Sequence, residues 1–371
     1  MILMINTASV LKGGGIQVAK SFIEECINHT EHEYHVVLSP TIAPLIDESE
    51  YPDNFCFYRI DYRPATRVFT FKSHDEFFKQ IEKKVKPDCV FTTSGPSYWR
   101  PKAKHIMGFN IAHYIYPESP FLSSLSIYRR VRWILKALIA KYFFRRDGDC
   151  FVVQTDDVNL RLRKWLSTSE VYTVTNSYGS HFNHSTKDVR MLPKKEGNEY
   201  RLLMLCAYYP HKNFEIINKV AELLHSRDIN NIKFVLTLAD GILREIFSPH
   251  ALSRIYNVGP VKPEGCPGLY QETDFVFSPT LLECFSANYV EAMFMKKPII
   301  TSDLGFARTV CGNAALYFDP LSAEDILDKI LLLTNSREIQ KEMIREGIKK
   351  LETFNDSKKR AQMYLSICEQ D

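Results

Sequence analysis

The stretch "DFVFSPTLLECFSANYVEAMFMKKPIITSD", residues 274–303, predicts a strand, a loop, a helix and a second strand in succession. Its first seven residues are largely apolar and suit a strand, whereas residues 289–297 contain good helix formers. Two lysines in the last turn of that helix and Pro298 just beyond it are signals of helix termination. A strand that returns through a helix to another strand is the repeating unit of a parallel sheet.

The same alternation runs through most of the chain and forms two series. Strands are expected in the first series at "MILMINTASV" (1–10), "EYHVVLSP" (33–40), "PDCVFTTSG" (87–95), "KHIMGFNIAH" (104–113), "CFVVQT" (150–155) and "VYTVTNS" (171–177). A polar, charged stretch follows, and the second series begins at "YRLLMLCAYY" (200–209). Because 371 residues exceed what one hydrophobic core usually serves, two domains are expected.

We therefore predict an α/β protein with two Rossmann-like, doubly wound parallel-sheet domains that face each other across a cleft. The predicted parts are an N-terminal domain at 1–185, a linker at 186–198, a C-terminal domain at 199–350, and a final helix within 351–371 that crosses back to the first domain. Ligands of such sheets bind at the carboxyl ends of the strands.

Composition excludes several classes of protein. An apolar content of 45% and a charged content of 25% are typical of globular domains, and a net charge of +3 is too small to indicate nucleic-acid binding. Nine scattered cysteines without a CxxC pair disfavour a disulfide framework or a zinc site and fit a reducing cytoplasm. The N-terminus lacks the basic region of a signal peptide, and no apolar run approaches the roughly 18 residues of a membrane span, so we expect a soluble or at most surface-bound protein.

Two carboxylates in the opening stretch suggest a ligand site. Glu283 falls in the predicted loop and Glu291 in the predicted helix, and eight helical residues would set them about 80° apart around an axis, so they are not a facing acid/base pair. Backbone N–H groups at the helix N-terminus between them suit a phosphate, and carboxylates accept hydrogen bonds from sugar hydroxyls. Two interpretations remain: the two glutamates bind opposite ends of one phosphate-linked sugar compound, or they are both solvated surface residues.

In this context the E-x7-E spacing resembles the retaining GT-B glycosyltransferases of family 4. "CAYYPHKNFEII" (206–217) is similar to that family's loop before the first C-terminal-domain helix, and "SDLGFARTVCGNAALYFDPLSAEDI" (302–326) to its segment after the second glutamate. "GGG" at 13–15 is similar to its N-terminal glycine loop. The resemblance implies a nucleotide-diphosphate sugar donor and retention at the anomeric carbon.

The resemblance also implies roles for individual residues. His113, Lys212 and Glu283 would be catalytic: Glu283 would contact donor-sugar hydroxyls, Lys212 would stabilise the diphosphate leaving group, and His113 would bind the sugar near the reacting carbon. Glu291 would hold the ribose. Further donor-binding positions would be Gly14, Gly15, His211, Pro260, Val261, Phe285, Ser286, Ala287 and Asn288.

Other positions are left open by their context. The turn at Ser94 and Gly95 follows a strand and is expected to line the cleft, and for His113 a structural role on the surface is the alternative. The chain departs from the family where Cys284 and Ser286 replace glycines. It also lacks an arginine in the few residues before Lys212, and His211 is expected to supply part of that polarity.

No metal or cofactor is predicted besides the nucleotide sugar as co-substrate. "GGGIQV" lacks the third glycine of a dinucleotide-binding loop. "DGD" at 147–149 has a D-x-D spacing but follows a basic helix instead of a strand, so we do not interpret it as a manganese motif.

A basic, apolar segment suggests a partner. Residues 124–148 contain Arg129, Arg130, Arg132, Lys136, Lys141, Arg145 and Arg146 interleaved with large apolar residues, and no acid precedes Asp147. Within 124–146 this pattern fits an anionic membrane surface, or a core-packed helix with a solvated basic face. The resemblance implies that the N-terminal domain binds a glycan or lipid-linked acceptor in bacterial cell-surface polysaccharide synthesis. We therefore expect a cytoplasmic location that is peripheral on the inner membrane face.

Two functions other than sugar transfer remain as alternatives. A nucleotide-sugar epimerase of the same fold would convert free donor without an acceptor. A non-catalytic, membrane-associated nucleotide-binding module would bind nucleotide without turnover.

Overall fold

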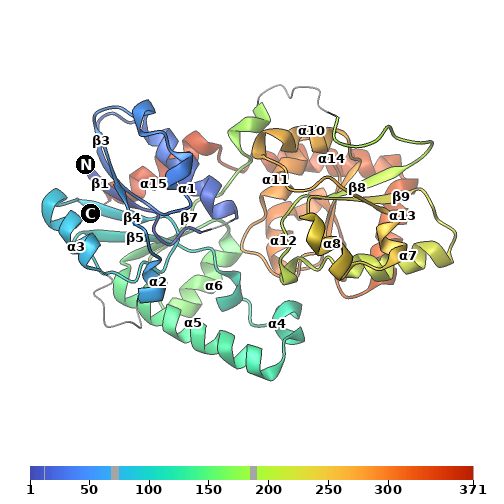
Figure 1. Ribbon diagram of the computed structural model, residues 1–371, viewed down its shortest axis with the longest axis horizontal. Coiled ribbons are helices and arrows are strands. Elements are labelled where there is room, and N and C mark those ends of the chain that lie inside the picture. Colours follow the sequence, from blue (N-terminus) through green and yellow to red (C-terminus); the bar gives the residue numbers. More distant parts are fainter. Residues whose placement is uncertain (12, 68–74, 184–189, 371) are drawn as a thin grey trace. The chain divides into compact units, whose positions relative to one another are not determined.

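The computed structural model describes residues 1–11, 13–67, 75–183 and 190–370, which fold into two compact units (Figure 1). Unit 1 comprises Met1–Pro117, Leu125–Asn176 and Asn355–Asp371, and unit 2 comprises Glu118–Ser124 and Ser177–Phe354. By contacts, the chain therefore enters the second unit briefly at Glu118–Ser124, passes to it again after Asn176 and returns after Phe354.

Unit 1 contains a seven-stranded sheet in the order β3-β2-β1-β4-β5-β6-β7, with every pairing parallel. Its strands are β1 (Ile2–Asn6), β2 (Glu33–Leu38), β3 (Phe55–Arg59), β4 (Cys89–Thr92), β5 (Lys104–Gly108), β6 (Cys150–Val153) and β7 (Val171–Thr173). Its helices are α1 (Gly14–Cys26), α2 (Pro64–Arg67), α3 (Glu76–Val85), α5 (Ile127–Asp147), α6 (Asp156–Leu166) and α15 (Ser357–Glu369), with 3-10 turns η1 (Ala43–Leu45), η2 (Glu48–Glu50) and η3 (Ala112–Tyr114).

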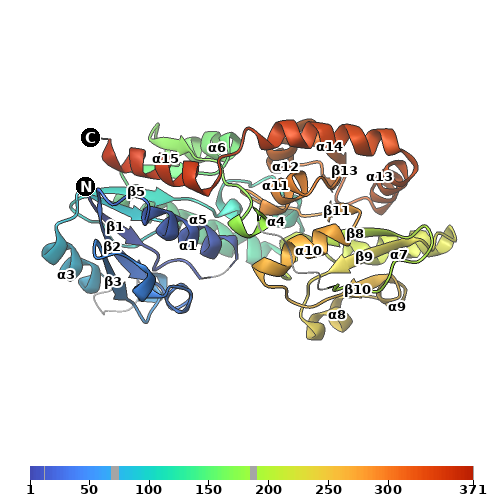
Figure 2. The same cartoon turned by 90° about the horizontal axis from the view of Figure 1, so that it is seen from above.

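Both faces of this sheet are covered by helices, which is why the central strands β1, β4 and β6 are buried along almost their whole length instead of alternating. Leu3 and Ile5 of β1 belong to one core cluster with side chains of α1 and α15, which lie side by side on that face (Figure 2). Met4 points to the opposite face and packs in a cluster with Phe78 of α3 and with Trp99.

Unit 2 contains a six-stranded, all-parallel sheet in the order β10-β9-β8-β11-β12-β13. Its strands are β8 (Tyr200–Met204), β9 (Ile232–Leu236), β10 (Ile255–Asn257), β11 (Phe275–Ser278), β12 (Ile299–Ser302) and β13 (Ala315–Phe318). Its helices are α4 (Pro120–Ser124), α7 (Ile216–Ser226), α8 (Asp240–Ile246), α9 (Pro249–Leu252), α10 (Cys266–Gln271), α11 (Ala287–Phe294), α12 (Gly305–Cys311), α13 (Ala323–Asn335) and α14 (Arg337–Leu351), with 3-10 turns η4 (Ser180–Asn183), η5 (Pro210–Lys212), η6 (Pro263–Gly265) and η7 (Gly312–Ala314).

The predicted fold class is confirmed, because each unit has a doubly wound parallel sheet. In both sheets the strand order reverses next to the first strand of the series, between β1 and β4 in unit 1 and between β8 and β11 in unit 2. The loops that leave the carboxyl ends of such neighbouring strands diverge to opposite faces and leave a crevice for ligands. The predicted cleft between the two domains stays a prediction.

The predicted linker, 186–198, is described only from residue 190 onward, and its first four residues lie outside the described part. The described remainder is fastened to unit 2: the backbone N–H groups of Met191 and Leu192 donate to the Glu272 carboxylate at 2.8 and 2.9 Å. Lys195 also pairs with Asp274 at 2.6 Å. These contacts integrate the end of the polar stretch into the second unit.

Helix α15 belongs to unit 1 and is held there by a buried guanidinium. Arg360 donates hydrogen bonds to the side chains of Asn176 and Ser21, the latter on α1. Asn176, near the point where the chain leaves unit 1, therefore binds the returning helix.

Candidate functional site

The loops that follow β8 and β11 meet at the point where the strand order of unit 2 reverses, because these two strands are hydrogen-bonded neighbours. The first loop ends in the turn η5, and the second leads into α11. The carbonyl of His211 joins the two loops, since it accepts the backbone N–H of Leu281 at 2.8 Å and the Thr280 hydroxyl at 3.2 Å.

Lys212 and Glu283 lie opposite each other across this junction and form an ion pair. Their side chains are only 15% and 14% exposed. Thr280 adds a hydrogen bond of 3.3 Å to the same carboxylate oxygen. Asn213 follows Lys212 in the left-handed conformation, φ 58°, which ends the turn.

Electrostatics keep Lys212 charged despite its burial. Desolvation is the largest single effect and would lower its pKa, but the charge of Glu283, its hydrogen bond and smaller effects of Cys206 and Tyr209 together hold the pKa above its ordinary value. Nearby Cys206, by contrast, has its pKa raised to about 11, chiefly by burial. At neutral pH the site therefore presents the Lys212 ammonium beside Glu283, while the Cys206 thiol stays protonated.

Glu291 occupies α11, as predicted, and is partly buried. The hydroxyl of Tyr270, on α10, donates to its carboxylate at 2.8 Å. Burial raises the pKa of Glu291 to about 7, and the Tyr270 hydrogen bond only partly opposes this. The two glutamates are thus not solvated surface charges, which removes one of the two alternatives left by the sequence.

The segment between the glutamates turns into the first turn of α11. Ser286, the residue before that helix, is buried and its side chain forms no capping hydrogen bond. Asn288 donates from its amide to the carbonyl of Leu205, just after β8, at 2.7 Å. Phe285 packs edge-on against Phe354, with ring centroids 6.2 Å apart. The predicted donor-binding positions Phe285 and Ser286 therefore share a loop with Glu283, and Ala287 and Asn288 begin the helix that follows it.

The remaining predicted positions of unit 2 are more dispersed. The ring of His211 stacks against Tyr209 at 5.6 Å and meets Phe121 edge-on at 5.9 Å. Pro260 and Val261 follow β10, two strands away from β8 in the sheet. Gly259, just before them, has φ 73°, a conformation that favours glycine.

In unit 1, the predicted glycines and the Ser94 turn lie at the corresponding reversal between β1 and β4. A side chain on Gly14 would meet open space, and one on Gly15 would lie 3.5 Å from the Asn110 amide. Ser94 donates to Asn110 at 3.0 Å. Gly95 is different, because a Cβ there would lie 2.6 Å from the Phe144 ring. Packing against the core of unit 1 thus accounts for that glycine.

His113 lies in η3 and stacks on Trp133 of α5, with ring centroids 4.3 Å apart and planes 14° from parallel. The structure therefore gives this histidine a defined ring orientation within unit 1.

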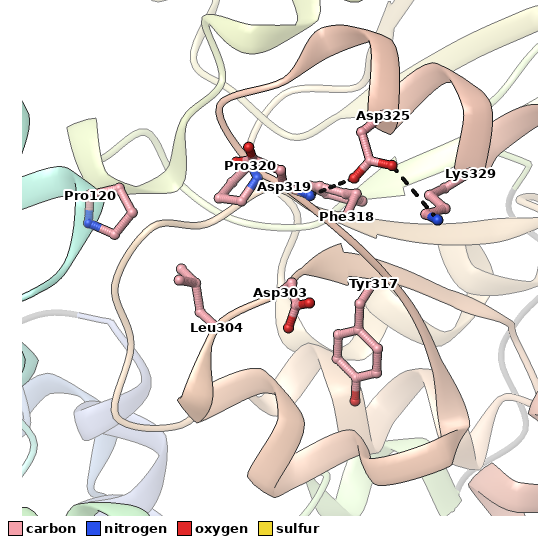
Figure 3. A pocket seen from close by; sticks show the side chains of 9 residues that line it. All are labelled: Pro120, Asp303, Leu304, Tyr317, Phe318, Asp319, Pro320, Asp325 and Lys329. Atoms are coloured by element: carbon pink, nitrogen blue, oxygen red, sulfur yellow. Dashed lines mark hydrogen bonds and ion pairs between the residues drawn. The ribbon is translucent and has the colours of Figure 1, made fainter.

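Unit 2 also contains a cavity of about 430 Å³, at the carboxyl ends of β12 and β13 (Figure 3). Its walls include Asp303, Tyr317, Asp319, Asp325 and Lys329, of which Asp325 pairs with Lys329. None of the positions predicted from sequence lines it.

Sequence reasoning missed the residues that position the predicted ones. Tyr270 precedes Glu291 by 21 positions, and Asn110 follows Ser94 by 16, so only the fold brings each pair together. Within residues 1–11, 13–67, 75–183 and 190–370, no three His, Cys, Asp or Glu side chains gather in a way that could hold a metal ion.

Comparison with known proteins identifies a similar family and several similar structures. Residues 187–350 match the model of the family described as glycosyl transferases group 1. No curated protein matches the sequence. Sucrose-phosphate synthase from Thermosynechococcus elongatus has a similar structure, with a TM-score of 0.72 and 14% identity over 99% of this chain and 97% of that one.

Two further solved structures are similar over their whole length. HepE from Anabaena, in complex with UDP and glucose, has a TM-score of 0.67 and 12% identity over 99% of each chain. WaaG, a glycosyltransferase involved in lipopolysaccharide biosynthesis, has a TM-score of 0.69 and 13% identity over 100% of each chain. These likenesses show that the fold is that of the GT-B glycosyltransferases. Residues 187–350 are thus similar to the glycosyl transferases group 1 family.

Proposed function

We propose that this protein is a retaining glycosyltransferase that moves a sugar from a nucleotide-diphosphate sugar to a glycan or lipid-linked acceptor. The observation that supports this most is the Lys212–Glu283 pair, which stands where the strand order of unit 2 reverses, with Glu291 in the helix that follows Glu283. A cation for a diphosphate and two carboxylates for sugar hydroxyls are the groups that such a donor requires.

In this proposal the bond between the anomeric carbon and the diphosphate oxygen breaks, and the acceptor oxygen bonds to the same face of that carbon. The proton of the acceptor hydroxyl passes to the leaving diphosphate. Lys212 stabilises the charge that develops on the diphosphate, as preorganised cations do in a partly dry site. Glu283 orients the donor sugar through its hydroxyls, and the pairing keeps Lys212 charged.

Glu291 holds the ribose of the donor. A buried carboxylate with a raised pKa gains when hydroxyl donors reach it, because these hydrogen bonds favour its charged form. Tyr270 already fills one acceptor position and fixes the orientation of the group. Ser286 and Ala287 stand at the start of α11, and the backbone N–H groups of a helix N-terminus suit a phosphate.

The likeness to HepE in complex with UDP and glucose, and to WaaG of lipopolysaccharide biosynthesis, supports a nucleotide-sugar donor and a role in cell-surface polysaccharide synthesis. In the same proposal the donor is handled without a metal ion, and the enzyme works in the cytoplasm near the inner membrane face.

A thermal-shift screen with UDP, GDP, ADP and their common sugar conjugates, in EDTA, tests the proposal. A ligand that binds only the folded chain raises the melting temperature by mass action. We expect a rise with one diphosphate that disappears in Glu291→Ala, followed by sugar transfer to an acceptor from the matching donor. No rise with any nucleotide, from well-folded protein, would refute the proposal, and conversion of free donor without acceptor would point to an epimerase.

A further inference from the structure

Helix α5 of unit 1 presents a large apolar surface to solvent. Of the fourteen exposed large apolar side chains among the described residues, eight lie on this helix between Ile127 and Tyr142. Ile127 and Tyr128 are 80% and 77% exposed, and Ile134, Leu135 and Leu138 each exceed half. Scattered exposed apolar residues are ordinary, whereas a contiguous group of this size marks an interaction surface.

Helical geometry gathers these eight residues on one side. At about 100° per residue they fall within an arc of roughly 140° around the axis, which includes Ile134 at one edge and Ile139 at the other. The residues that anchor α5 to its own unit, Ala140 and Phe144 among them, lie nearly opposite. Helix α5 is therefore apolar on two sides, of which one is already used in the fold and the other is not.

Basic side chains flank the exposed arc. By the same angular count Arg132 lies just beyond one edge of the arc, and Lys141 and Arg130 lie just beyond the other. Arg145 and Arg146 fall within the arc at the C-terminal end of the helix. Lys136 and Arg129 lie farther round, toward the anchored side. No acidic residue occurs between Glu118 and Asp147, so the charge of this helix alone exceeds the +3 of the whole chain. Arg129, Arg132, Lys136, Lys141 and Arg145 form no ion pair with another described residue.

The geometry points to an anionic lipid bilayer as the occupant of this face. Apolar side chains would enter the boundary between headgroups and acyl chains, while the long basic side chains reach outward to anionic headgroups. Because α5 carries seven basic residues, we expect it to lie on the surface of the bilayer instead of crossing it. No described helix is long and apolar enough to cross a bilayer. A second copy of the chain fits less well, because docking α5 on α5 would bring rows of like charge together.

This inference does not depend on glycosyl transfer and is tested with full-length protein and vesicles. We expect flotation with vesicles of phosphatidylcholine containing about 30% phosphatidylglycerol, little flotation with phosphatidylcholine alone, and weaker binding at high salt. Replacing Tyr128 by Trp should add emission that brominated lipids quench, whereas Leu332→Trp, on α13, should add emission that they do not.

Two sets of variants separate charge from insertion. Arg129→Gln, Arg132→Gln and Arg145→Gln together should weaken binding roughly a hundredfold, at about fivefold per base. Lys341→Gln, Lys358→Gln and Lys359→Gln remove the same charge from other exposed positions and should change binding severalfold at most. Ile134→Ser with Leu138→Ser should abolish quenching and reduce binding, unlike Leu332→Ser with Ile348→Ser.

Melting curves establish that each variant is folded. The inference is overturned if the wild type ignores anionic vesicles, or if both α5 sets bind as the wild type does. It is equally overturned if the protein is a dimer without lipid and Ile134→Ser with Leu138→Ser makes it a monomer, because the face would then join two copies of the chain.

Discussion

Lys212 and Glu283 form an ion pair across 71 positions of sequence, joining the loop after β8 to the loop after β11. Both side chains are largely withdrawn from solvent, and Glu283 stabilises the charge of Lys212. A site built this way holds its ammonium in place before any ligand arrives, so little reorganisation is needed when a negative charge develops nearby.

Replacing Lys212 by Met keeps the aliphatic stem and removes the cation. We expect kcat for sugar transfer to fall about 10²–10³-fold, the usual cost of losing one preorganised electrostatic contact to a leaving group. Lys219→Met, at an exposed position of α7, is the matched control and should retain activity. A kcat for Lys212→Met within a few-fold of wild type would show that this ammonium does not act on the diphosphate.

The pair should also be visible in stability. Lys212→Met and Glu283→Gln each leave one partly buried polar or charged partner unsatisfied, and each should lower the melting temperature. The double variant should melt higher than the sum of the two losses predicts, because contacting residues couple by about 0.5–3 kcal/mol. For a unit of this size about 1 kcal/mol corresponds to about 2–4 °C in scanning calorimetry. Additive losses would mean that the two side chains do not interact in solution.

Much of the fold followed from hydrophobic pattern. The strands at β1, β2, β4, β8 and β11 were predictable because each is a short apolar run that ends at a polar turn. β3 (Phe55–Arg59) and β13 (Ala315–Phe318) were not identified, because both lie at the outer edge of a sheet and are only partly buried. The helix at 289–297 was placed slightly late; α11 begins at Ala287 and ends at Phe294.

For the candidate site, the sequence pattern predicted the acidic and basic side chains but not the residues that surround them. Glu283 and Glu291 stood out by spacing and Lys212 by its loop. Tyr270, which orients Glu291, lies in a helix without any recognisable motif. Likewise, nothing in the letters around Gly95 shows that Phe144, 49 positions later, occupies the space of its missing side chain. Such relationships depend on tertiary packing, which one sequence does not encode locally.

Two glycines predicted for the same site should respond differently to alanine. Gly95→Ala would press a methyl group into Phe144 and should destabilise unit 1 by about 1–3 kcal/mol, measured as a lower melting temperature. Gly14→Ala meets open space at the start of α1 and should leave the melting temperature nearly unchanged. If donor phosphate approaches this backbone closely, Gly14→Ala should still raise the KM for donor. A Gly14→Ala enzyme with wild-type stability and wild-type KM would remove the glycine loop from the donor site.

Glu291 predicts a pH dependence of stability whose sign is opposite to that of most carboxylates. Its folded pKa of about 7 exceeds the ordinary value of 4.5, so between these pH values the folded chain holds a proton that the unfolded chain has released. Stability contributed by this group therefore falls as pH rises from about 4.5 to 7. Glu291→Gln, which keeps an acceptor for Tyr270, should become more stable relative to wild type across that window, by at most about 3 kcal/mol above it.

The same carboxylate should make donor binding depend on pH. Ribose hydroxyls donate to the charged form, so binding of the nucleoside diphosphate found in the screen must release the proton at low pH. Its Kd, followed by calorimetry, should rise up to about tenfold per unit as pH falls below about 7, and level off above it. Ionisation of the diphosphate also contributes there, and Glu291→Gln isolates that contribution because it has no carboxylate to titrate. If the pH profiles of Kd for wild type and Glu291→Gln are parallel, the ribose does not bind to Glu291. If the profile flattens in Glu291→Gln and this variant also binds more weakly at pH 8, the ribose binds to this side chain.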